Sequence, residues 1–287
     1  MRLPERRLSA LATAFAVVCS AAAADRPAGP AKRKVLVELF TSQGCDSCPA
    51  AETLFGRLRD PGYGPDRVVP VAFHVDYFNT PWKDRFSDHE FSKRQYEYSL
   101  IHQRENGTDD PNYLFFTPML MVDGRTPMLG SDRARAQAAL KRAAAEKPGA
   151  SIAARLEGSP DDPRRKTLSA EVAASSLSAS GRDLLVGVAV VEDSTSTKVG
   201  SGENSGKTLR EHHAVRRFVY QKVRLTGAKS KSVSFPLTLA DGCDPEGCSV
   251  AVFVQDWKDG RVHQAESLRW AAAGVRKGGR AVGAASR

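Results

Sequence analysis

The segment that says most about this chain is Val35-Leu36-Val37-Glu38-Leu39-Phe40-Thr41-Ser42-Gln43-Gly44-Cys45-Asp46-Ser47-Cys48-Pro49. Its first six residues are apolar apart from Glu38, which is typical of a buried strand. A short polar turn then leads into two cysteines three positions apart, and apolar residues recur at helical spacing up to Leu58. The segment therefore predicts a strand, a tight turn with a Cys-x-x-Cys pair, and a helix.

The position of the two cysteines predicts redox chemistry. Cys45 lies where the strand turns into the helix, so its sulfur is near free backbone N–H groups and the positive end of the helix dipole, which favour the thiolate. We therefore expect Cys45 to be the exposed nucleophile and Cys48 the buried residue that resolves the mixed disulfide. On spacing alone, half of a zinc site or a static surface disulfide stays open as an alternative.

Residues 35–148 predict strands and helices in alternation. Apolar runs indicate strands at residues 35–40, 68–75, 113–122 and 125–129. Ser87-x-x-Glu90 has the form of a capping box that begins a helix, and Asp123-Gly124 indicates a hairpin turn. An alanine-rich helix after Asp132 ends at Pro148. The predicted order is strand, helix, strand, helix, strand, strand, helix.

This order, together with Thr117-Pro118 before a strand and a hairpin, resembles a thioredoxin fold. The resemblance implies that Pro118 is a cis-proline packed against the redox pair and that the backbone of Thr117 binds an extended substrate. Glu38 resembles the buried acid that helps to move the proton of the second cysteine. The alternative for Glu38 is a strand residue whose carboxylate reaches solvent.

Further motifs carry a closer resemblance. They are Val37-Glu38-Leu39-Phe40-Thr41-Ser42-Gln43-Gly44-Cys45 with Ser47-Cys48-Pro49, Phe73-His74-Val75-Asp76-Tyr77, Trp82-Lys83-Asp84 and Arg94-Gln95. Together they resemble the exported bacterial thioredoxin-like family catalogued as domain of unknown function 1223, over roughly residues 35–260. The resemblance implies a thioredoxin-like fold and no established substrate. Asp46 stands where a serine is expected, and its negative charge, which opposes a thiolate, predicts a moderate rather than a strongly oxidising pair.

The first 24 residues have the order of a secretory signal peptide. Arginines precede an apolar run at residues 8–18, and Ala22 and Ala24 indicate cleavage before Asp25. A membrane anchor is the alternative, but the run is short for the roughly 20 residues that span a bilayer, so we expect no stable span after cleavage. The sequence thus predicts a periplasmic or secreted protein.

The composition of the 287 residues is that of an ordinary soluble protein, with 41% hydrophobic and 26% charged residues. Cleavage removes three arginines and Glu5, a net +2, so the formal charge of +9 falls to +7. No basic stripe interleaved with aromatics indicates nucleic-acid binding. Residues 200–208 nearly spell a P-loop, but Ser201 stands where a glycine is required, so we expect no nucleotide.

Beyond residue 149 the pattern changes to short alternating segments separated by turn residues. Six or more strands of this kind predict an antiparallel sandwich or barrel. The expected fold class is therefore an α/β thioredoxin-like domain at residues 35–148 followed by an all-β sandwich-like domain at residues 149–270. Residues 25–34 are predicted to be a linker and residues 271–287 a disordered tail.

The two cysteines of the second half, Cys243 and Cys248, enclose a tight turn between two predicted strands. This setting suits a structural disulfide that staples a hairpin loop, and export makes disulfides plausible. A second redox pair is the alternative, but no helix N-terminus is expected there to activate it.

The sequence as a whole predicts an exported thiol-disulfide oxidoreductase that acts on proteins or small thiols and needs no bound cofactor. A membrane electron donor is a further expected partner. Two alternatives stay open. Cys45, Cys48 and His74 could bind or deliver copper, because soft thiolates with imidazole suit that metal. The chain could also be a non-catalytic binding module whose β domain recognises a partner.

Overall fold

The computed structural model describes residues 32–60, 67–110, 112–159, 161–174, 181–225 and 230–271. The predicted signal peptide, residues 25–31 of the predicted linker and residues 272–287 of the predicted tail lie outside the described residues.

The elements of the first half follow in the predicted order. They are β1 (Val35–Thr41), α1 (Cys48–Phe55), β2 (Val68–His74), α2 (His89–Asn106), β3 (Met119–Val122), β4 (Thr126–Leu129) and α3 (Arg133–Ala145). Asp88 caps α2, its carboxylate accepting from the backbone N–H of Glu90 at 2.9 Å, so the cap lies one residue after the predicted Ser87. Asp123 and Gly124 both have positive φ in the β3–β4 turn, which confirms the predicted hairpin.

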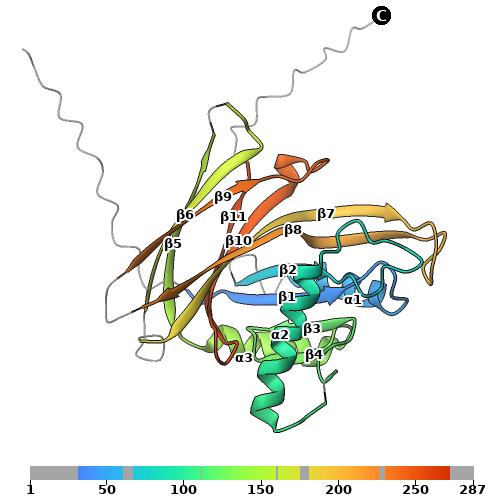
Figure 1. Cartoon of the computed structure of the whole chain (residues 1–287), viewed down its shortest axis with the longest axis horizontal. Coiled ribbons are helices and arrows are strands. Elements are labelled where there is room, and N and C mark those ends of the chain that lie inside the picture. The colour runs from blue at the N-terminus through green and yellow to red at the C-terminus, as the bar shows by residue number, and fades with distance from the viewer. Residues whose placement is uncertain are drawn as a thin grey trace, which may run out of the picture. The chain divides into compact units, whose positions relative to one another are not determined.

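The second half consists almost entirely of strands among the described residues. They are β5 (Ala150–Gly158), β6 (Arg165–Ala174), β7 (Asp183–Lys198), β8 (Thr208–Arg224), β9 (Lys231–Thr238), β10 (Cys248–Asp256) and β11 (Val262–Arg269), with the short 3₁₀ helix η2 (Pro245–Gly247) before β10. Eight strands form one mixed sheet in the order β11-β10-β7-β8-β2-β1-β3-β4, and β5-β6-β9 form a separate antiparallel sheet (Figure 1).

The predicted fold class is wrong. β8 pairs in parallel with β2 through Ala214 and Ala72, so β7, β8, β10 and β11 extend the sheet that begins with β1 and β2 instead of forming their own sandwich. The described chain is mostly β, and no clear thioredoxin α/β fold is present. Alternation along a segment reveals a half-buried strand, but it does not reveal which distant strand will pair with it.

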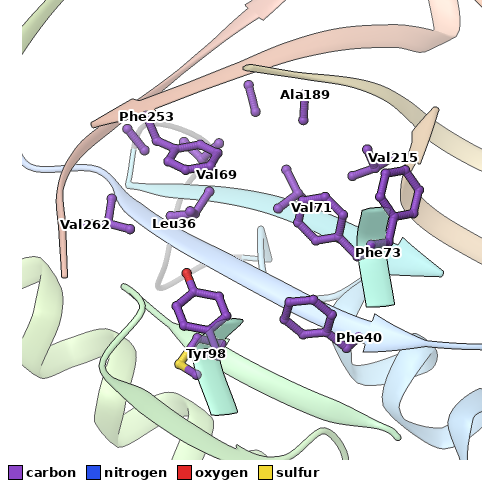
Figure 2. Close-up of a cluster of buried hydrophobic side chains, with 14 of the residues drawn as sticks. Leu36, Phe40, Val69, Val71, Phe73, Tyr98, Ala189, Val215, Phe253 and Val262 are labelled. Atoms are coloured by element: carbon purple, nitrogen blue, oxygen red, sulfur yellow. The ribbon is translucent and has the colours of Figure 1, made fainter. Parts of the chain in front are cut away.

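One hydrophobic cluster joins the two halves on the face of the large sheet against which α2 packs. Figure 2 shows side chains of this cluster and labels Leu36, Phe40, Val69, Val71, Phe73, Tyr98, Ala189, Val215, Phe253 and Val262. Residues 184–191 of β7 are buried on both faces. Leu185 and Ala189 enter this cluster, whereas Leu184 and Val186 face a second cluster shared with the β5-β6-β9 sheet. Helices α1 and α3 pack in a third cluster on the opposite face of β1 and β3.

Residues 32–34 are not part of a linker, because Arg33 is buried. Its guanidinium pairs with Asp123 at 2.5 Å and donates to the carbonyls of Ala143, Val262 and His263. Burial raises the pKa of Asp123 to about 6, although the charge of Arg33 opposes this. One arginine therefore ties the start of β1 to the β3–β4 turn, α3 and β11.

Candidate functional site

Cys45 and Cys48 form a disulfide across the turn between β1 and α1, with their Cα atoms 5.5 Å apart. The turn is narrow: the N–H of Cys45 donates to the carbonyl of Ser42, and that of Cys48 to the carbonyl of Cys45, both at 3.3 Å. Pro49 occupies the first turn of α1, where its missing N–H costs nothing. Gly44 is required here, because a Cβ on it would lie 2.6 Å from the carbonyl oxygen of Phe78.

Both cysteines are buried, which corrects the expectation that Cys45 is exposed. The exposed fraction is 3% for Cys45 and 1% for Cys48, whereas Asp46 and Ser47 between them are exposed. The hydroxyl of Ser47 lies 3.3 Å from the sulfur of Cys45 and makes no capping hydrogen bond to α1. A substrate therefore reaches the disulfide only if a neighbouring segment of the chain moves.

The loop between β7 and β8, residues 199–207, covers the disulfide turn. The side-chain amide of Asn204, fully buried, donates to the carbonyls of Gln43 and Cys45 at 3.0 and 2.9 Å. The carboxylate of Glu203 accepts from the backbone N–H of Asp46 at 2.9 Å. This is the glycine-rich segment that nearly spells a P-loop, and in the structure it holds a cysteine turn.

Pro118 lies close to the disulfide helix, and the peptide bond that precedes it is cis. Gly130 sits between them: a Cβ on Gly130 would be 2.9 Å from the Cβ of Ala51 in α1 and 3.0 Å from that of Pro118. The hydroxyl oxygen of Thr117 is buried without a hydrogen-bond partner. The cis peptide expected at this position is thus present, and its role in substrate binding stays a prediction.

Glu38 is not brought to the disulfide. Its side chain faces α2, where its carboxylate accepts from Arg94 at 2.7 Å and from the hydroxyl of Tyr98 at 2.5 Å. Gln255 completes the buried network by bonding both Arg94 and Tyr98. Helix α1, which begins at Cys48, packs on the opposite face of β1, so the side chain of Glu38 points away from Cys48 and packs with α2. The predicted role of Glu38 as proton carrier for Cys48 therefore has no geometric support.

A different set of buried charges lies beside the disulfide. Nδ1 of His74 donates to Asp84 at 2.7 Å, and the same carboxylate oxygen accepts from the N–H of Gln43 at 2.8 Å. The side-chain amide of Gln43 donates to Glu211 at 2.7 Å. Nε2 of His74 lies 4.0 Å from Oε1 of Glu52, which is longer than a hydrogen bond. We name Glu52, His74, Asp84 and Glu211 the buried charge cluster.

Three atoms of this cluster are buried and have no hydrogen-bond partner: Oε1 of Glu52, Nε2 of His74 and Oε2 of Glu211. They come from α1, β2 and β8. A cavity of about 440 Å³ lies between these elements, lined by Ser42, Gln43, Cys48, Glu52, His74 and Glu211 among others. Cys48 therefore lines the same cavity as Glu52, His74 and Glu211.

Burial and mutual charge set the protonation of the cluster. Burial raises the pKa of Glu52 to about 7 and that of Glu211 to about 7, although the charge of His74 lowers both. Burial also lowers the pKa of His74, but the charge and hydrogen bond of Asp84 outweigh it, and the pKa of His74 rises to about 9. At neutral pH the cluster holds a charged His74–Asp84 pair beside two carboxyl groups whose ionisation is opposed by burial.

Cys243 and Cys248 are free thiols in the structure, so the predicted structural disulfide is not formed. Cys248 is buried at the start of β10 opposite Glu192 of β7, and the thiol of Cys243 donates to Glu192 at 3.7 Å. The hydrogen bond from Cys248 lowers the pKa of Cys243, and the same bond raises that of Cys248.

Within the part of the chain that the structure describes, no three His, Cys, Asp or Glu side chains are grouped as ligands for a metal ion. The copper alternative through Cys45, Cys48 and His74 gains no support from the geometry, because the two sulfurs are bonded to each other. No helix among the described residues is both long and apolar enough to cross a membrane.

Sequence reasoning found the cysteine pair and Pro118 but missed Glu52, Asn204 and Glu211. Glu52 had a usable signal, since it stands four residues after Cys48 on a predicted helix and must share its face. Asn204 and Glu211 had none, because β7 and β8 are expected in a separate domain until the pairing of β8 with β2 is known.

These features define a class: a mixed β-sheet protein that buries a Cys-x-x-Cys disulfide at the start of a helix, beside a cluster of buried charges. The chain belongs to the family described as Protein of unknown function (DUF1223), whose model matches residues 36–255. No curated protein matches it.

Two solved structures share the fold. Protein AGR_C_4864 from Agrobacterium tumefaciens is 22% identical, with a TM-score of 0.61 over 85% of this chain and 97% of that one. HBP35 of Porphyromonas gingivalis is 15% identical, with a TM-score of 0.59 over 89% of this chain and 81% of that one. At these identities the likeness concerns the fold alone.

Proposed function

We propose that this protein is an exported thiol-disulfide oxidoreductase that exchanges the Cys45–Cys48 disulfide with thiols or disulfides of proteins or small molecules. The observation that carries the proposal is the disulfide itself, formed across the turn that leads into α1 and adjoining a cavity. A disulfide stabilises a fold more when the loop that it closes is longer, and this one closes a loop of four residues, so it limits the unfolded chain very little.

The roles of the two cysteines follow from their positions. Cys45 precedes the exposed residues Asp46 and Ser47 and is proposed to form the mixed disulfide with the substrate. Cys48 begins α1, faces the cavity and is proposed to resolve that mixed disulfide. Pro118 and the backbone of Thr117 are proposed to hold an extended substrate segment beside the pair.

Two carboxylates bear on the redox poise. Asp46 stands between the cysteines, and Glu203 accepts from the N–H of Asp46 at the entrance to α1. Negative charge at this point opposes a thiolate on Cys45, and a stabilised thiolate is what makes such a pair strongly oxidising. We therefore place the reduction potential between those of thioredoxin, about −270 mV, and DsbA, about −120 mV, and away from the upper end.

Export is proposed from the N-terminal sequence, where arginines, an apolar run and small residues follow in the order of a signal peptide. In a periplasmic or extracellular setting the pair meets thiol and disulfide proteins, and a membrane electron donor would recycle it if it acts as a reductant.

The experiment compares the purified mature protein with Cys45→Ser and Cys48→Ser in insulin reduction and in oxidative refolding of a reduced disulfide protein. We expect turnover in at least one assay, loss of turnover in both variants, and accumulation of a mixed disulfide on Cys45 in Cys48→Ser. Cys243→Ser, which leaves the Cys45–Cys48 pair intact, is the control. A pair that turns over neither substrate and does not react with glutathione would remove the proposal.

A further inference from the structure

The buried charge cluster holds more polar atoms than its hydrogen bonds satisfy. Two of its carboxyl groups and its imidazole each leave an atom buried and unpartnered, which costs free energy unless the atoms have another use. Glu52 stands four residues after Cys48 in α1, so their side chains lie on the same helix face, and both line the cavity. Among the four members of the cluster, Glu52 is thus the one nearest to Cys48 in the sequence.

We propose that Glu52 is the proton acceptor for the Cys48 thiol and that His74, Asp84 and Glu211 tune it for this task. The inference rests on the proposed function, because it concerns the second step of thiol-disulfide exchange. It also assigns to Glu52 the task that sequence resemblance gives to Glu38, which the structure places with Arg94 against α2.

In the proposed step the two cysteines reduce a substrate disulfide. In the reduced protein, the Cys45 thiolate attacks one sulfur of a substrate disulfide and releases the other as a thiolate. The S–H of Cys48 then gives its proton to the carboxylate of Glu52, directly or through a water molecule in the cavity. The Cys48 sulfur bonds to that of Cys45, the bond from Cys45 to the substrate breaks, and the second substrate sulfur leaves as a thiolate. Two electrons pass from the dithiol to the substrate, and the proton on Glu52 returns to the departing thiolate or to solvent.

The surroundings of Glu52 suit this cycle. A base must be ionised to accept a proton and basic enough to hold it, so the best pKa lies near the working pH. Burial raises the pKa of Glu52 to about 7, with the charge of Glu211 adding to the rise and that of His74 limiting it. The backbone N–H of His212 donates to Glu52 at 3.3 Å and fixes one carboxylate oxygen, which leaves Oε1 free. The charged and titratable side chains on the elements around Glu52 are Arg57, His74, Asp84, Arg210, Glu211 and His212.

The test separates the two steps with a synthetic disulfide, so it does not need the natural substrate. Reduced protein in which Cys243 and Cys248 are replaced with serine, so that only Cys45 and Cys48 react, is mixed rapidly with 5,5′-dithiobis(2-nitrobenzoate), and the release of coloured thiolate is followed. The first equivalent reports attack by Cys45 and the second reports resolution by Cys48. In the wild type we expect the second rate constant to rise with pH and level off near the pKa of Glu52.

In Glu52→Gln, which keeps the shape of the side chain, we expect the second phase to slow by about 100-fold at pH 7 while the first is unchanged. Its pH dependence should then follow the Cys48 thiol instead of levelling off. Glu211→Gln removes a charge that raises the pKa of Glu52, so the midpoint should move to lower pH with the plateau retained. Glu157→Gln, exposed on β5, is the matched control.

An unchanged second phase in Glu52→Gln would overturn the inference. If Glu52→Gln does not fold, Glu52→Asp replaces it in the test. The pH midpoint of the second-phase rate constant should then differ from that of the wild type, and an unchanged midpoint counts against the inference. The two proposals fail differently. Normal two-phase chemistry without any turnover of insulin or refolding substrates removes the proposed function alone. Turnover with a second phase that is indifferent to Glu52 removes this inference alone.

Discussion

Replacing Asn204 with alanine should open the disulfide to reductants. The side chain of Asn204 is fully buried, and its NH2 group donates two hydrogen bonds to the turn, to the carbonyls of Gln43 and Cys45. A hydrogen bond of this kind contributes about 1 kcal/mol net, so the variant loses about 2 kcal/mol of the free energy that holds the β7–β8 loop on the turn. Since 1.4 kcal/mol corresponds to a factor of ten, the open form should become about 30-fold more populated.

The assay is the rate at which dithiothreitol reduces the disulfide at pH 7, followed by quenched alkylation and mass measurement. If reduction requires the loop to open, the rate for Asn204→Ala should rise by up to the same factor of about 30. Ser205→Ala, an exposed position in the same loop, is the control and should react like the wild type. Equal or slower reduction of Asn204→Ala in a folded protein would refute the view that this loop limits access.

Three further outcomes test the structure. Gly130→Ala should lower the free energy of unfolding in urea by about 1–3 kcal/mol, because its Cβ would lie 2.9 to 3.1 Å from side-chain carbons of Ala51, Pro118 and Leu39. An unfolding free energy equal to that of the wild type would contradict this. Arg94→Met should lower the free energy of unfolding by about 3–5 kcal/mol, because it leaves the Glu38 carboxylate buried without a cation. Adding Glu38→Gln should restore part of that free energy. A double variant as unstable as Arg94→Met would argue against a paired charge. Folding raises the pKa of Glu52 from 4.5 to about 7, so the stability that this group contributes is complete below about pH 4.5 and is lost as the pH rises through 7, by about 3 kcal/mol. Urea titrations across this range should show that the free energy of unfolding falls less with pH in Glu52→Gln than in the wild type. An equal fall in both proteins would exclude Glu52 as its source.

The local features of the first half could be predicted because their causes are local. An apolar run before a cysteine turn gives β1, a first-turn proline helps to begin α1, and Asp123-Gly124 supplies the two positive φ angles that a tight hairpin needs. Each of these depends on residues within a few positions of one another. The order of elements through α3 followed from the same kind of pattern.

The pairing of β8 with β2 could not be predicted, because it joins residues far apart in the sequence through the backbone. Ala72 and Ala214 are small residues in apolar strands, and neither specifies a partner. The sequence of β7 did carry a hint, since residues 184–191 are nearly all apolar where a sandwich strand with one wet face would alternate. That run reflects burial on both faces.

In the candidate site, too, features with local causes could be predicted and features that depend on distant contacts could not. The cysteine pair and the cis peptide before Pro118 lie in short motifs and were predicted, whereas Glu38 was given a role from resemblance that its contact with Arg94 excludes. The predicted bond between Cys243 and Cys248 required knowledge of where the two side chains point, which their spacing does not supply.

The pairing of β8 with β2 has a consequence for how the chain is made. Until synthesis passes residue 214, the edge of β2 has no partner, and Asn204 is not yet available to cover the cysteine turn. At 5–20 residues per second, this interval lasts roughly ten to thirty seconds. An unpaired strand edge of apolar residues is prone to aggregation, so the nascent chain should depend on chaperones during this window. The same order leaves Cys45 and Cys48 accessible to oxidants and small thiols while an exported chain is still emerging from the membrane, so the disulfide can form before the second half of the protein encloses it.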